Sequence, residues 1–284
     1  MRTDTVPDFL YIGTSKAGST WLFNALAVCP DVWLASNKGL YFFDAHYERG
    51  VDWYRQQFQD AEGRAVGEFS HSYLSSPEAP PRIAAYSPSM RLLVCLREPV
   101  DRAFSDYLDL VKNNGYTGSF TDAVVQHPRL LDRGRYATHL SRYLEHFPMS
   151  QIHVGLFDDL KTGAQAYADE VYDFLGLDRL MLSEGDLKAR MPAGRPRNAA
   201  VVGLAKRASK GAASLGLRRW RSRIKRSTVV RSALYKQYRD DKPRLDPSVR
   251  DELRAGFADE VARLDHLLGR PVSQTWGYDP AEVS

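Results

Sequence analysis

The sequence lacks several features that define whole classes of protein. In its 284 residues no apolar run approaches the ~20 residues that a membrane-spanning helix needs. The first ten residues, "MRTDTVPDFL", lack the basic start and apolar core of a secretory signal. The two cysteines, Cys29 and Cys95, belong to no CxxC pair and to no Cys/His pattern with metal-ligand spacing. We therefore expect a cytoplasmic protein without a metal, whose cysteines are reduced and lie in the core.

Acidic residues are missing from one long segment. From Lys206 to Arg231 there are ten Lys or Arg and no Asp or Glu, although the net charge of the whole chain is only +4. The remainder of the chain is therefore net acidic. Trp220 and Ile224 lie among these arginines, a pattern compatible with binding to nucleic acid or to an anionic membrane surface. The interpretation that we favour is a solvated, helical insertion at about residues 199–236, within a single domain that covers residues 1–284.

Apolar runs and helical patterns alternate through the first two thirds of the chain. Strands are predicted at residues 8–13, 30–36, 64–70, 90–98 and 151–157. Helices are predicted at residues 19–29, 99–114, 119–147, 163–177 and 246–269. The helix at 99–114 has Phe104, Leu108 and Val111 on one face, and the last helix is expected to pack back on the main domain. This alternation predicts an α/β fold with a central parallel sheet flanked by helices.

A lysine lies in a glycine-flanked loop, "GTSKAGST", between the first predicted strand and the first predicted helix. Such a turn exposes backbone N–H groups at the positive end of the helix dipole, where anions bind. Gly13 and Gly18 have the spacing of a Walker A motif, but Ser19 stands where that motif has its lysine. The lysine of this chain, Lys16, lies inside the loop. The pattern predicts a P-loop-like phosphate cradle but not an ordinary P-loop ATPase.

A second candidate anion site follows the most apolar of the predicted strands. In "CLREPVDRAFSDY", Arg97 lies at the carboxyl end of that strand and Ser105 lies about two turns into the next helix. A guanidinium can hold a phosphate through two hydrogen bonds, and a nearby hydroxyl can donate to the same group. The alternative is that Arg97 pairs with Glu98 or Asp101. Two anion sites, each after a strand, predict a ligand with phosphates at both ends.

The order of these motifs resembles a known family. "GTSKAGSTWL" resembles the 5′-phosphosulfate loop of sulfotransferases that use 3′-phosphoadenosine 5′-phosphosulfate (PAPS), and "LREPVDRAFSDY" resembles their 3′-phosphate motif. The resemblance extends over nearly the whole chain, through "NKGLYFFD", "GEFSHSYLSSP", "GRYATHLSRYLEHFPMSQIHVGLFDDL", "FLGL" and "LLGRPVSQTW". The chain looks most similar to the bacterial and Golgi carbohydrate sulfotransferases, including those that act on heparan sulfate.

The resemblance implies a nucleotide site and a reaction. The donor-binding residues that it implies are Lys16, Ala17, Gly18, Ser19, Thr20, Trp21, Arg97, Ser105, Gly194, Arg195 and Arg197. The first loop would surround the 5′-phosphosulfate, Arg97 and Ser105 would hold the 3′-phosphate, and "AGRPRN" would close over the nucleotide. The reaction would be in-line transfer of SO3 from PAPS to a hydroxyl or amine, with release of adenosine 3′,5′-bisphosphate (PAP). Lys16 would be catalytic, because its ammonium can stabilise charge on the bridging oxygen.

The sequence departs from the family pattern at the general base. Many relatives have Lys-Glu before the aromatic pair of "NKGLYFF", and here Gly39 replaces that Glu. His71 is a candidate base, because imidazole titrates near working pH and relatives usually have Pro at this position. Glu68 and Asp44 are carboxylate alternatives. Two further alternatives are an acceptor that ionises easily, as a phenol does, and a chain that binds the nucleotide without transferring the group.

Two other classes compete with the transferase. A nucleic-acid or membrane-surface binding protein would use the basic segment. A nucleotide kinase would need Mg²⁺ ligands, and "HVGLFDD" is the nearest approach to a Walker B run. For the transferase we expect a carbohydrate or small-molecule acceptor. A sugar or another ring in the acceptor could pack on the aromatic residues Tyr41, Phe42, Tyr73 and Tyr107, although such residues can equally belong to the hydrophobic core. The Arg- and Ala-rich composition favours a bacterial enzyme of natural-product biosynthesis.

Overall fold

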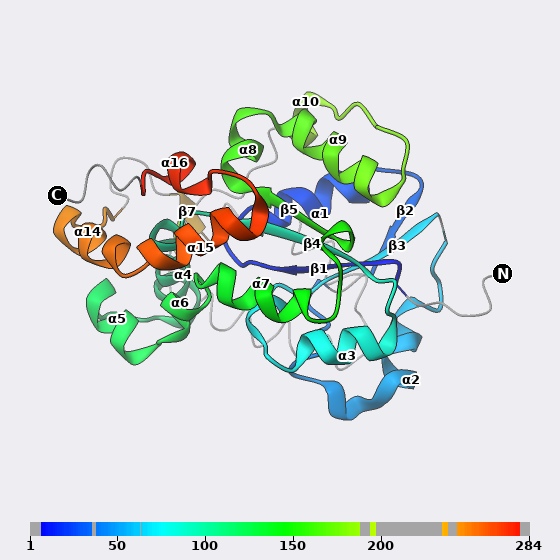
Figure 1. The fold of residues 1–284 in the computed structure, drawn as a ribbon, viewed down its shortest axis with the longest axis horizontal. Coiled ribbons are helices and arrows are strands. Elements are labelled where there is room, and N and C mark those ends of the chain that lie inside the picture. The colour runs from blue at the N-terminus through cyan, green and yellow to red at the C-terminus, as the bar shows by residue number, and fades with distance from the viewer. Residues whose placement is uncertain are drawn as a thin grey trace.

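The computed structural model describes residues 7–35, 38–62, 64–187 and 243–278, and the backbone of two short strands at 194–196 and 235–237. Its centre is a five-stranded parallel sheet with helices on both faces, which confirms the predicted α/β fold (Figure 1). The strands of this sheet are β1 (Phe9–Gly13), β2 (Val32–Leu34), β3 (Ala65–Phe69), β4 (Arg91–Leu96) and β5 (Ile152–Leu156). Two further strands, β6 (Gly194–Pro196) and β7 (Tyr235–Gln237), pair antiparallel with one another.

Helices occupy most of the remaining described chain. In the first half they are α1 (Ser19–Ala27), α2 (Gly50–Arg55), α3 (Ala79–Tyr86), α4 (Pro99–Asn114), α5 (Phe120–Gln126), α6 (Arg129–Asp132) and α7 (Tyr136–Leu144). In the second half they are α8 (Phe157–Thr162), α9 (Ala164–Leu175), α10 (Glu184–Leu187), α14 (Pro247–Ala255), α15 (Ala258–Leu268) and α16 (Val272–Trp276). Among the described helices we find none with the length and apolar content that crossing a bilayer requires.

The strand order determines where loops from distant parts of the sequence meet. The order across the sheet is β2-β3-β1-β4-β5, so β1 lies between β3 and β4. Tyr11 on β1 is in register with Phe69 on β3 and with Leu93 on β4. Because the strands are parallel, the segments that follow β1, β3 and β4 leave the sheet at one edge. This is the switch point of an open α/β sheet, where such folds bind ligands.

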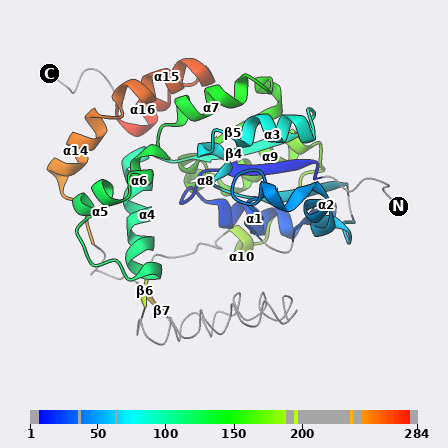
Figure 2. The same ribbon diagram turned by 90° about the horizontal axis from the view of Figure 1, so that it is seen from below.

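The two faces of the sheet bury separate cores. Leu10 and Ile12 on β1 point to a core closed by α3, α7 and α15, whereas Phe9 and Tyr11 point to a core closed by α1, α8 and α9. Figure 2 shows α3, α7 and α15 on one side of the sheet and α1 on the other. The near-continuous apolar sequences of β1 and β4 follow from this arrangement, because both faces of these strands are covered. Cys29 and Cys95 are buried and unpaired, as predicted.

The C-terminal segment packs on the main body as predicted, but as two helices. The predicted helix at 246–269 divides into α14 and α15 at Gly256. Phe257, Val261 and Leu264 of this segment lie in the core that covers one face of the sheet, and α15 contacts α7. The break lets α15 lie along α7 while α14 contacts α4.

Other boundaries differ from the predictions. The helical region at 119–147 is three helices, α5, α6 and α7. On α4 the buried apolar residues include Leu108 but not Phe104 or Val111. The Phe104 ring instead meets Phe120 on α5 edge-on at 5.3 Å, outside the two main cores.

The predicted insertion at 199–236 lies almost wholly outside the described residues. The backbone of Tyr235 and Lys236, at its end, belongs to strand β7 and not to a helix. The basic segment 206–231 lies outside the described residues. The predictions of a helical insertion and of a single domain over residues 1–284 stay predictions.

Candidate active site

Three loops meet at the carboxyl edge of the sheet. They follow β1 (Thr14–Gly18), β3 (Ser70–Ser72) and β4 (Arg97 and Glu98). Arg97 Nη1 donates a hydrogen bond to the Lys16 carbonyl oxygen at 3.3 Å, so the two predicted anion sites lie side by side. The sheet therefore joins two motifs that are 81 positions apart in the chain.

The loop after β1 has the backbone geometry of an anion cradle. Lys16 has a φ of +66° and Gly18, which caps α1, has a φ of +91°. A Cβ at position 18 would lie 2.6 Å from Leu160 Cδ2, so both the turn and the close packing of α8 require glycine there. The first turn of α1 contains no acidic residue. The N–H groups of Ser19, Thr20 and Trp21 have no partner within the helix and can bind an anion.

Helix α4 supports this loop from the side. Ser15 Oγ donates to Asp106 Oδ2 at 3.5 Å. The same carboxylate oxygen lies 3.3 Å from Arg102 Nη1 and 3.1 Å from Arg133 Nη1. The Arg102 side chain is wholly buried, so two guanidinium groups, one of them inaccessible, hold Asp106 in place. The position of the cradle is therefore coupled to α4.

Lys16 forms an exposed ion pair beside the cradle. Its Nζ lies 3.0 Å from Asp109 Oδ1, and the two side chains are 28% and 43% exposed. Burial alone would raise the pKa of the Asp109 carboxyl, but the Lys16 ammonium, Asn113 and Lys112 together outweigh this and the pKa is lowered. Exposed pairs of this kind contribute ~0.2–1 kcal/mol, so an anionic ligand can draw the ammonium away from Asp109.

Lys38 is a second cation at the cradle, and the sequence reasoning missed it. Its Nζ donates to Ser19 Oγ and to Thr20 Oγ1, both at 3.1 Å, and lies 5.9 Å and 5.8 Å from the ring centroids of Phe23 and Phe69. The residue reaches solvent, but the protein around its ammonium desolvates the charge and lowers its pKa to about 8. The sequence feature that could have indicated Lys38 is its position directly before Gly39, where it matches the Lys of the family's Lys-Glu pair.

Arg97 keeps hydrogen-bonding capacity for a ligand. Besides its bond to the Lys16 carbonyl, its guanidinium lies 5.1 Å from the centroid of the Phe157 ring. Its Nη2 is 4.0 Å from Asp101 Oδ2, the outer limit of an ion pair. Its buried Nε has no hydrogen-bond partner in the part of the chain that the structure describes. The Arg97 side chain is 20% exposed, so its guanidinium can still meet a phosphate oxygen at this edge.

The alternative role of Arg97, as the partner of a neighbouring carboxylate, has little support in the geometry. Asp101 pairs more closely with Arg250, at 2.8 Å. Glu98 accepts hydrogen bonds from the Asp101 N–H and from the Tyr278 hydroxyl, both at 2.6 Å. Both candidate carboxylates thus have closer partners than Arg97.

The other predicted donor-binding residues are placed less directly. Ser105 lies on α4, half-buried, next to Asp106. The Trp21 side chain is 6% exposed, packs edge-on against Tyr167 and donates from Nε1 to the Leu187 carbonyl at 3.2 Å. The indole therefore belongs to the core, and the group that Trp21 offers the cradle is its backbone N–H.

The late loop can be placed only in part. Gly194 and Arg195 belong to β6, which contacts α4, the helix that carries Ser105. The backbone is described there and the side chains are not, and Arg197 lies outside the described residues. The predicted contacts of this loop with the nucleotide stay predictions.

His71 lies at the same edge, two residues after β3. Its Nε2 is 2.8 Å from Tyr41 Oη, and its buried Nδ1 has no hydrogen-bond partner within the described chain. Burial, followed by the charge of Arg133, lowers the pKa of the imidazole to about 4. His71 is therefore neutral near pH 7, as a proton acceptor must be.

The two carboxylate alternatives lie in different surroundings. Glu68 is 1% exposed and accepts hydrogen bonds from the hydroxyls of Tyr54 at 2.9 Å, Tyr73 at 3.2 Å and Ser70. Burial raises its pKa to about 7. Such an enclosed carboxyl is placed to support the loop after β3 and not to meet an acceptor. Asp44 is half-buried and accepts a hydrogen bond from the Ser72 hydroxyl.

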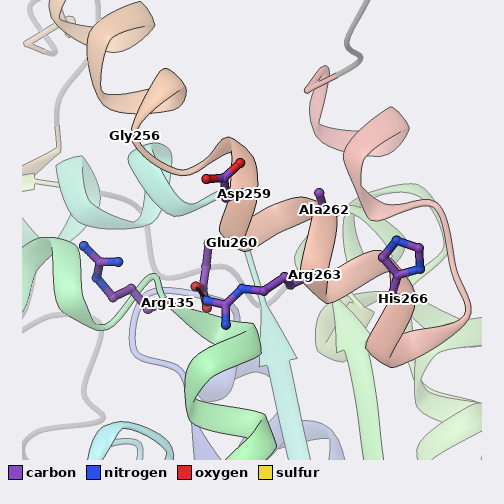
Figure 3. A pocket seen from close by; sticks show the side chains of 7 residues that line it. All are labelled: Arg135, Gly256, Asp259, Glu260, Ala262, Arg263 and His266. Carbon is purple, nitrogen blue, oxygen red and sulfur yellow. Dashed lines mark hydrogen bonds and ion pairs between the residues drawn. The ribbon is translucent and has the colours of Figure 1, made fainter.

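A separate surface pocket of about 650 Å³ lies between Arg135 and helix α15 (Figure 3). Its lining residues are Arg135, Gly256, Asp259, Glu260, Ala262, Arg263 and His266. Glu260 accepts from the Thr138 N–H at 2.7 Å and pairs with Arg263, so these charges are satisfied within the protein. None of the predicted site residues lines this pocket. In the described ranges we also find no cluster of three or more His, Cys, Asp or Glu placed to hold a metal ion, and the expected absence of a metal stays a prediction.

These features define an α/β protein with a candidate anion site at the carboxyl edge of a parallel sheet. The family described as "Sulfotransferase domain" matches residues 6–190, more than half of the chain. The chain therefore belongs to the sulfotransferase domain family. The predicted resemblance is confirmed, and the kinase interpretation gives way to it.

The curated relatives include heparan sulfate enzymes. The chain is 34% identical over 186 residues to heparan sulfate glucosamine 3-O-sulfotransferase 3A1 of Mus musculus, a match that covers 62% of this chain and 47% of the relative. It is 34% identical over 184 residues to heparan sulfate glucosamine 3-O-sulfotransferase 6 of Homo sapiens, covering 62% of this chain and 54% of the relative. The chain thus spans about half the length of these curated relatives.

A solved structure shares the fold over nearly the full chain. A sulfotransferase from Alicyclobacillus acidocaldarius superposes with a TM-score of 0.71 at 24% identity, covering 96% of this chain and 99% of that chain. At this identity the likeness concerns the fold alone. It extends beyond residue 190, where the family match ends.

Proposed function

We propose that this protein transfers a sulfuryl group from PAPS to a hydroxyl or amine of a carbohydrate or small-molecule acceptor, and releases PAP. One observation carries the proposal. At one edge of the sheet, the Lys38 ammonium lies on the hydroxyls of Ser19 and Thr20 at the start of α1, and the Arg97 guanidinium lies on the backbone of the loop that carries Lys16. Membership of the sulfotransferase domain family supports the same reaction.

The residues present suit a donor with two anionic ends. PAPS supplies an activated sulfuryl group on its 5′-phosphate and carries a second phosphate on its 3′ oxygen. The cradle, with the Lys16 and Lys38 ammonium groups and the N–H groups of α1, would hold the first end. The exposed part of the Arg97 guanidinium and Ser105 on the following helix would hold the second.

The chain would act mainly through positioning and charge stabilisation. Lys16 would leave Asp109 and stabilise the negative charge that grows on the bridging oxygen of the leaving phosphate. Lys38 and the hydroxyls of Ser19 and Thr20 would orient the sulfuryl oxygens. Holding the reactants in line converts a bimolecular step into an effectively unimolecular one, which is the main contribution available where the protein forms no covalent bond.

The acceptor and the general base are part of the same proposal. The relatives are named for heparan sulfate glucosamine, which favours a carbohydrate hydroxyl as acceptor. A small-molecule acceptor, as in natural-product biosynthesis, is the second candidate. We propose His71 as the base that takes up the proton released on transfer, because it is neutral and lies at the site.

The test is calorimetric binding of PAP, followed by transfer of radiolabelled sulfate from PAPS to a desulfated heparan oligosaccharide and to 1-naphthol. Lys16→Ala and Arg97→Ala should each weaken PAP binding by at least tenfold, since charge-assisted hydrogen bonds contribute ~1.5–3 kcal/mol. Arg179→Ala is the control, because Arg179 pairs with Asp173 at an exposed position. Absence of PAP binding to the wild-type protein would overturn the proposal.

A further inference from the structure

Two residues with unusual backbone conformations, Gly39 and Tyr41, bring the Tyr41 phenol into contact with His71. Tyr41 has a φ of +51°, a left-handed conformation that costs a non-glycine residue ~1–2 kcal/mol. Gly39 has a φ of +86°, and a Cβ built there would lie 2.6 Å from Cε2 of the Tyr41 ring. The Tyr41 N–H donates to Ser70 Oγ at 2.9 Å, which fixes the turn on the segment after β3. The Tyr41 ring thus occupies the space that a side chain at position 39 would need.

His71 cannot accept a proton directly from a bound acceptor in this arrangement. Its Nε2 is engaged by the Tyr41 hydroxyl at 2.8 Å, and its Nδ1 is buried without a partner in the described chain. The polar group of the pair that remains available is Tyr41 Oη, on a half-buried residue. An acceptor would therefore meet the phenol and not the imidazole.

We propose that Tyr41 and His71 form a proton relay, in which Tyr41 Oη contacts the acceptor and His71 Nε2 receives the proton that Tyr41 releases. This inference rests on the proposed function. As the acceptor oxygen forms its bond to sulfur, its O–H bond breaks and its proton goes to Tyr41 Oη. The former Tyr41 proton moves to Nε2, and the electron pair of the breaking S–O bond leaves on the 5′-phosphate oxygen. After the product leaves, the imidazolium returns its proton to Tyr41 Oη, and Tyr41 passes a proton to solvent.

The relay requires the tautomer with the proton on Nδ1, so that Nε2 can accept from Tyr41. The charged groups around His71 are Arg133, Asp106 and Lys38. Those around Tyr41 are Asp44, Arg133 and Glu68. Burial raises the pKa of Tyr41 and lowers that of His71, so the pair is neutral at rest.

A bound anionic donor would change this balance in favour of transfer. Lys38 is one of the positive charges that lower the pKa of His71. Its ammonium donates hydrogen bonds to the hydroxyls of the cradle, those of Ser19 and Thr20. A donor with several negative charges in the cradle would offset the repulsion from Lys38 and Arg133. The relay is therefore expected to accept a proton when the donor is in place.

The experiment compares two acceptors of different acidity. Tyr41→Phe, His71→Gln and the double variant are assayed with PAPS and either a desulfated heparan oligosaccharide or 1-naphthol. With the oligosaccharide each single variant should lower kcat by ~100-fold or more, and the double variant should be no worse than the singles, because the residues act as a unit. With the more acidic naphthol, assayed at pH 9, the loss should stay below ~10-fold. Tyr47→Phe is the matched control, since Tyr47 is an exposed tyrosine whose ring packs on Phe42.

Each outcome decides between the proposals. If wild-type protein does not bind PAP, the proposed function fails and the relay fails with it. If wild-type protein binds PAP and transfers sulfate while Tyr41→Phe keeps its kcat with the oligosaccharide, the relay alone is wrong. Equal losses with both acceptors, or a weakened PAP affinity in Tyr41→Phe, would show a structural role and would also overturn the relay.

Discussion

The titration of Lys38 gives a quantitative test of the donor site. Its ammonium lies on Ser19 and Thr20 at 3.1 Å and has a pKa of about 8, lowered by desolvation. If the cradle binds PAP only when the Lys38 side chain is charged, then only the molecules that carry a proton on Lys38 can bind PAP. PAP affinity should then be constant below pH 8 and fall as pH rises above it, by up to about tenfold per pH unit.

The expected magnitude follows from the fraction of protonated Lys38. With a pKa of about 8, roughly three quarters of the molecules carry the proton at pH 7.5 and about 3% at pH 9.5. The Kd for PAP should therefore rise roughly 25-fold over this range. At pH 8 binding should take up about half a proton, because the anion restores the full charge of the ammonium.

The assay is isothermal titration calorimetry with PAP between pH 7 and pH 9.5, in two buffers of different ionisation enthalpy. Lys38→Arg should bind PAP with an affinity that does not change over this range, because arginine stays charged. Lys38→Ala should bind ~10- to 100-fold more weakly at pH 7, with the same flat profile. A flat wild-type profile, or a slope that persists in Lys38→Arg, would refute the reasoning.

Three further predictions concern neighbouring groups. Lys16→Ala should lower turnover at saturating PAPS by ~100-fold or more, the scale of losing one preorganised charge donor, and normal turnover would contradict its role. Asp109→Asn removes the exposed partner of Lys16 and should tighten PAP binding, by up to about fivefold in calorimetry. Burial raises the pKa of the Glu68 carboxyl from 4.5 to about 7, so the folded protein favours the protonated carboxyl. This contribution to the free energy of unfolding is fully present below pH 4.5 and is lost as pH rises through about 7. Glu68→Gln does not lose this contribution. In urea unfolding, the free energy of unfolding of Glu68→Gln minus that of wild type should therefore rise by ~2–3 kcal/mol from pH 5 to pH 8. A difference that does not change with pH would contradict the raised pKa.

The donor side of the site could be predicted from sequence because its signals are local. "GTSKAGST" combines a strand end, two glycines and a helix start within eight residues, and backbone geometry then determines where the N–H groups point. Arg97 could be predicted because it directly follows the most apolar strand. That these two motifs meet at the Lys16 carbonyl required only that β1 and β4 be neighbours in the sheet.

The acceptor side, and the Lys38 contact on the donor side, could be predicted only in part, because these contacts join loops of irregular backbone. Lys38 meets Ser19 across 19 positions, and Tyr41 meets His71 across 30. No periodicity in the sequence indicates such a pairing. Glu68 was a reasonable candidate as a carboxylate near His71, but β3 is buried along its whole length and its apolar neighbours gave no sign of the hydroxyl cluster that holds the carboxyl.

Gly39 allows a direct test of whether the Tyr41 ring, and not the lost carboxylate, defines this side of the site. Gly39→Ala would place a Cβ 2.6 Å from the Tyr41 ring, at a residue with a φ of +86°. Gly50→Ala is the matched control, because Gly50 has a φ of +78° but nothing within 4 Å of a built Cβ. Both variants should lose ~1 kcal/mol of stability from backbone strain.

Only Gly39→Ala should also displace the phenol from His71. Transfer of sulfate to the oligosaccharide should then fall at least ~10-fold in Gly39→Ala and stay at the wild-type rate in Gly50→Ala, because general-base assistance contributes ~100-fold or more. PAP affinity should be unchanged in both variants, since neither position contacts the cradle through a side chain. Full transfer activity in Gly39→Ala would mean that the acceptor's proton leaves by a route that does not include Tyr41. The glycine would then show that the Glu of the relatives has been lost without being replaced by the Tyr41–His71 pair.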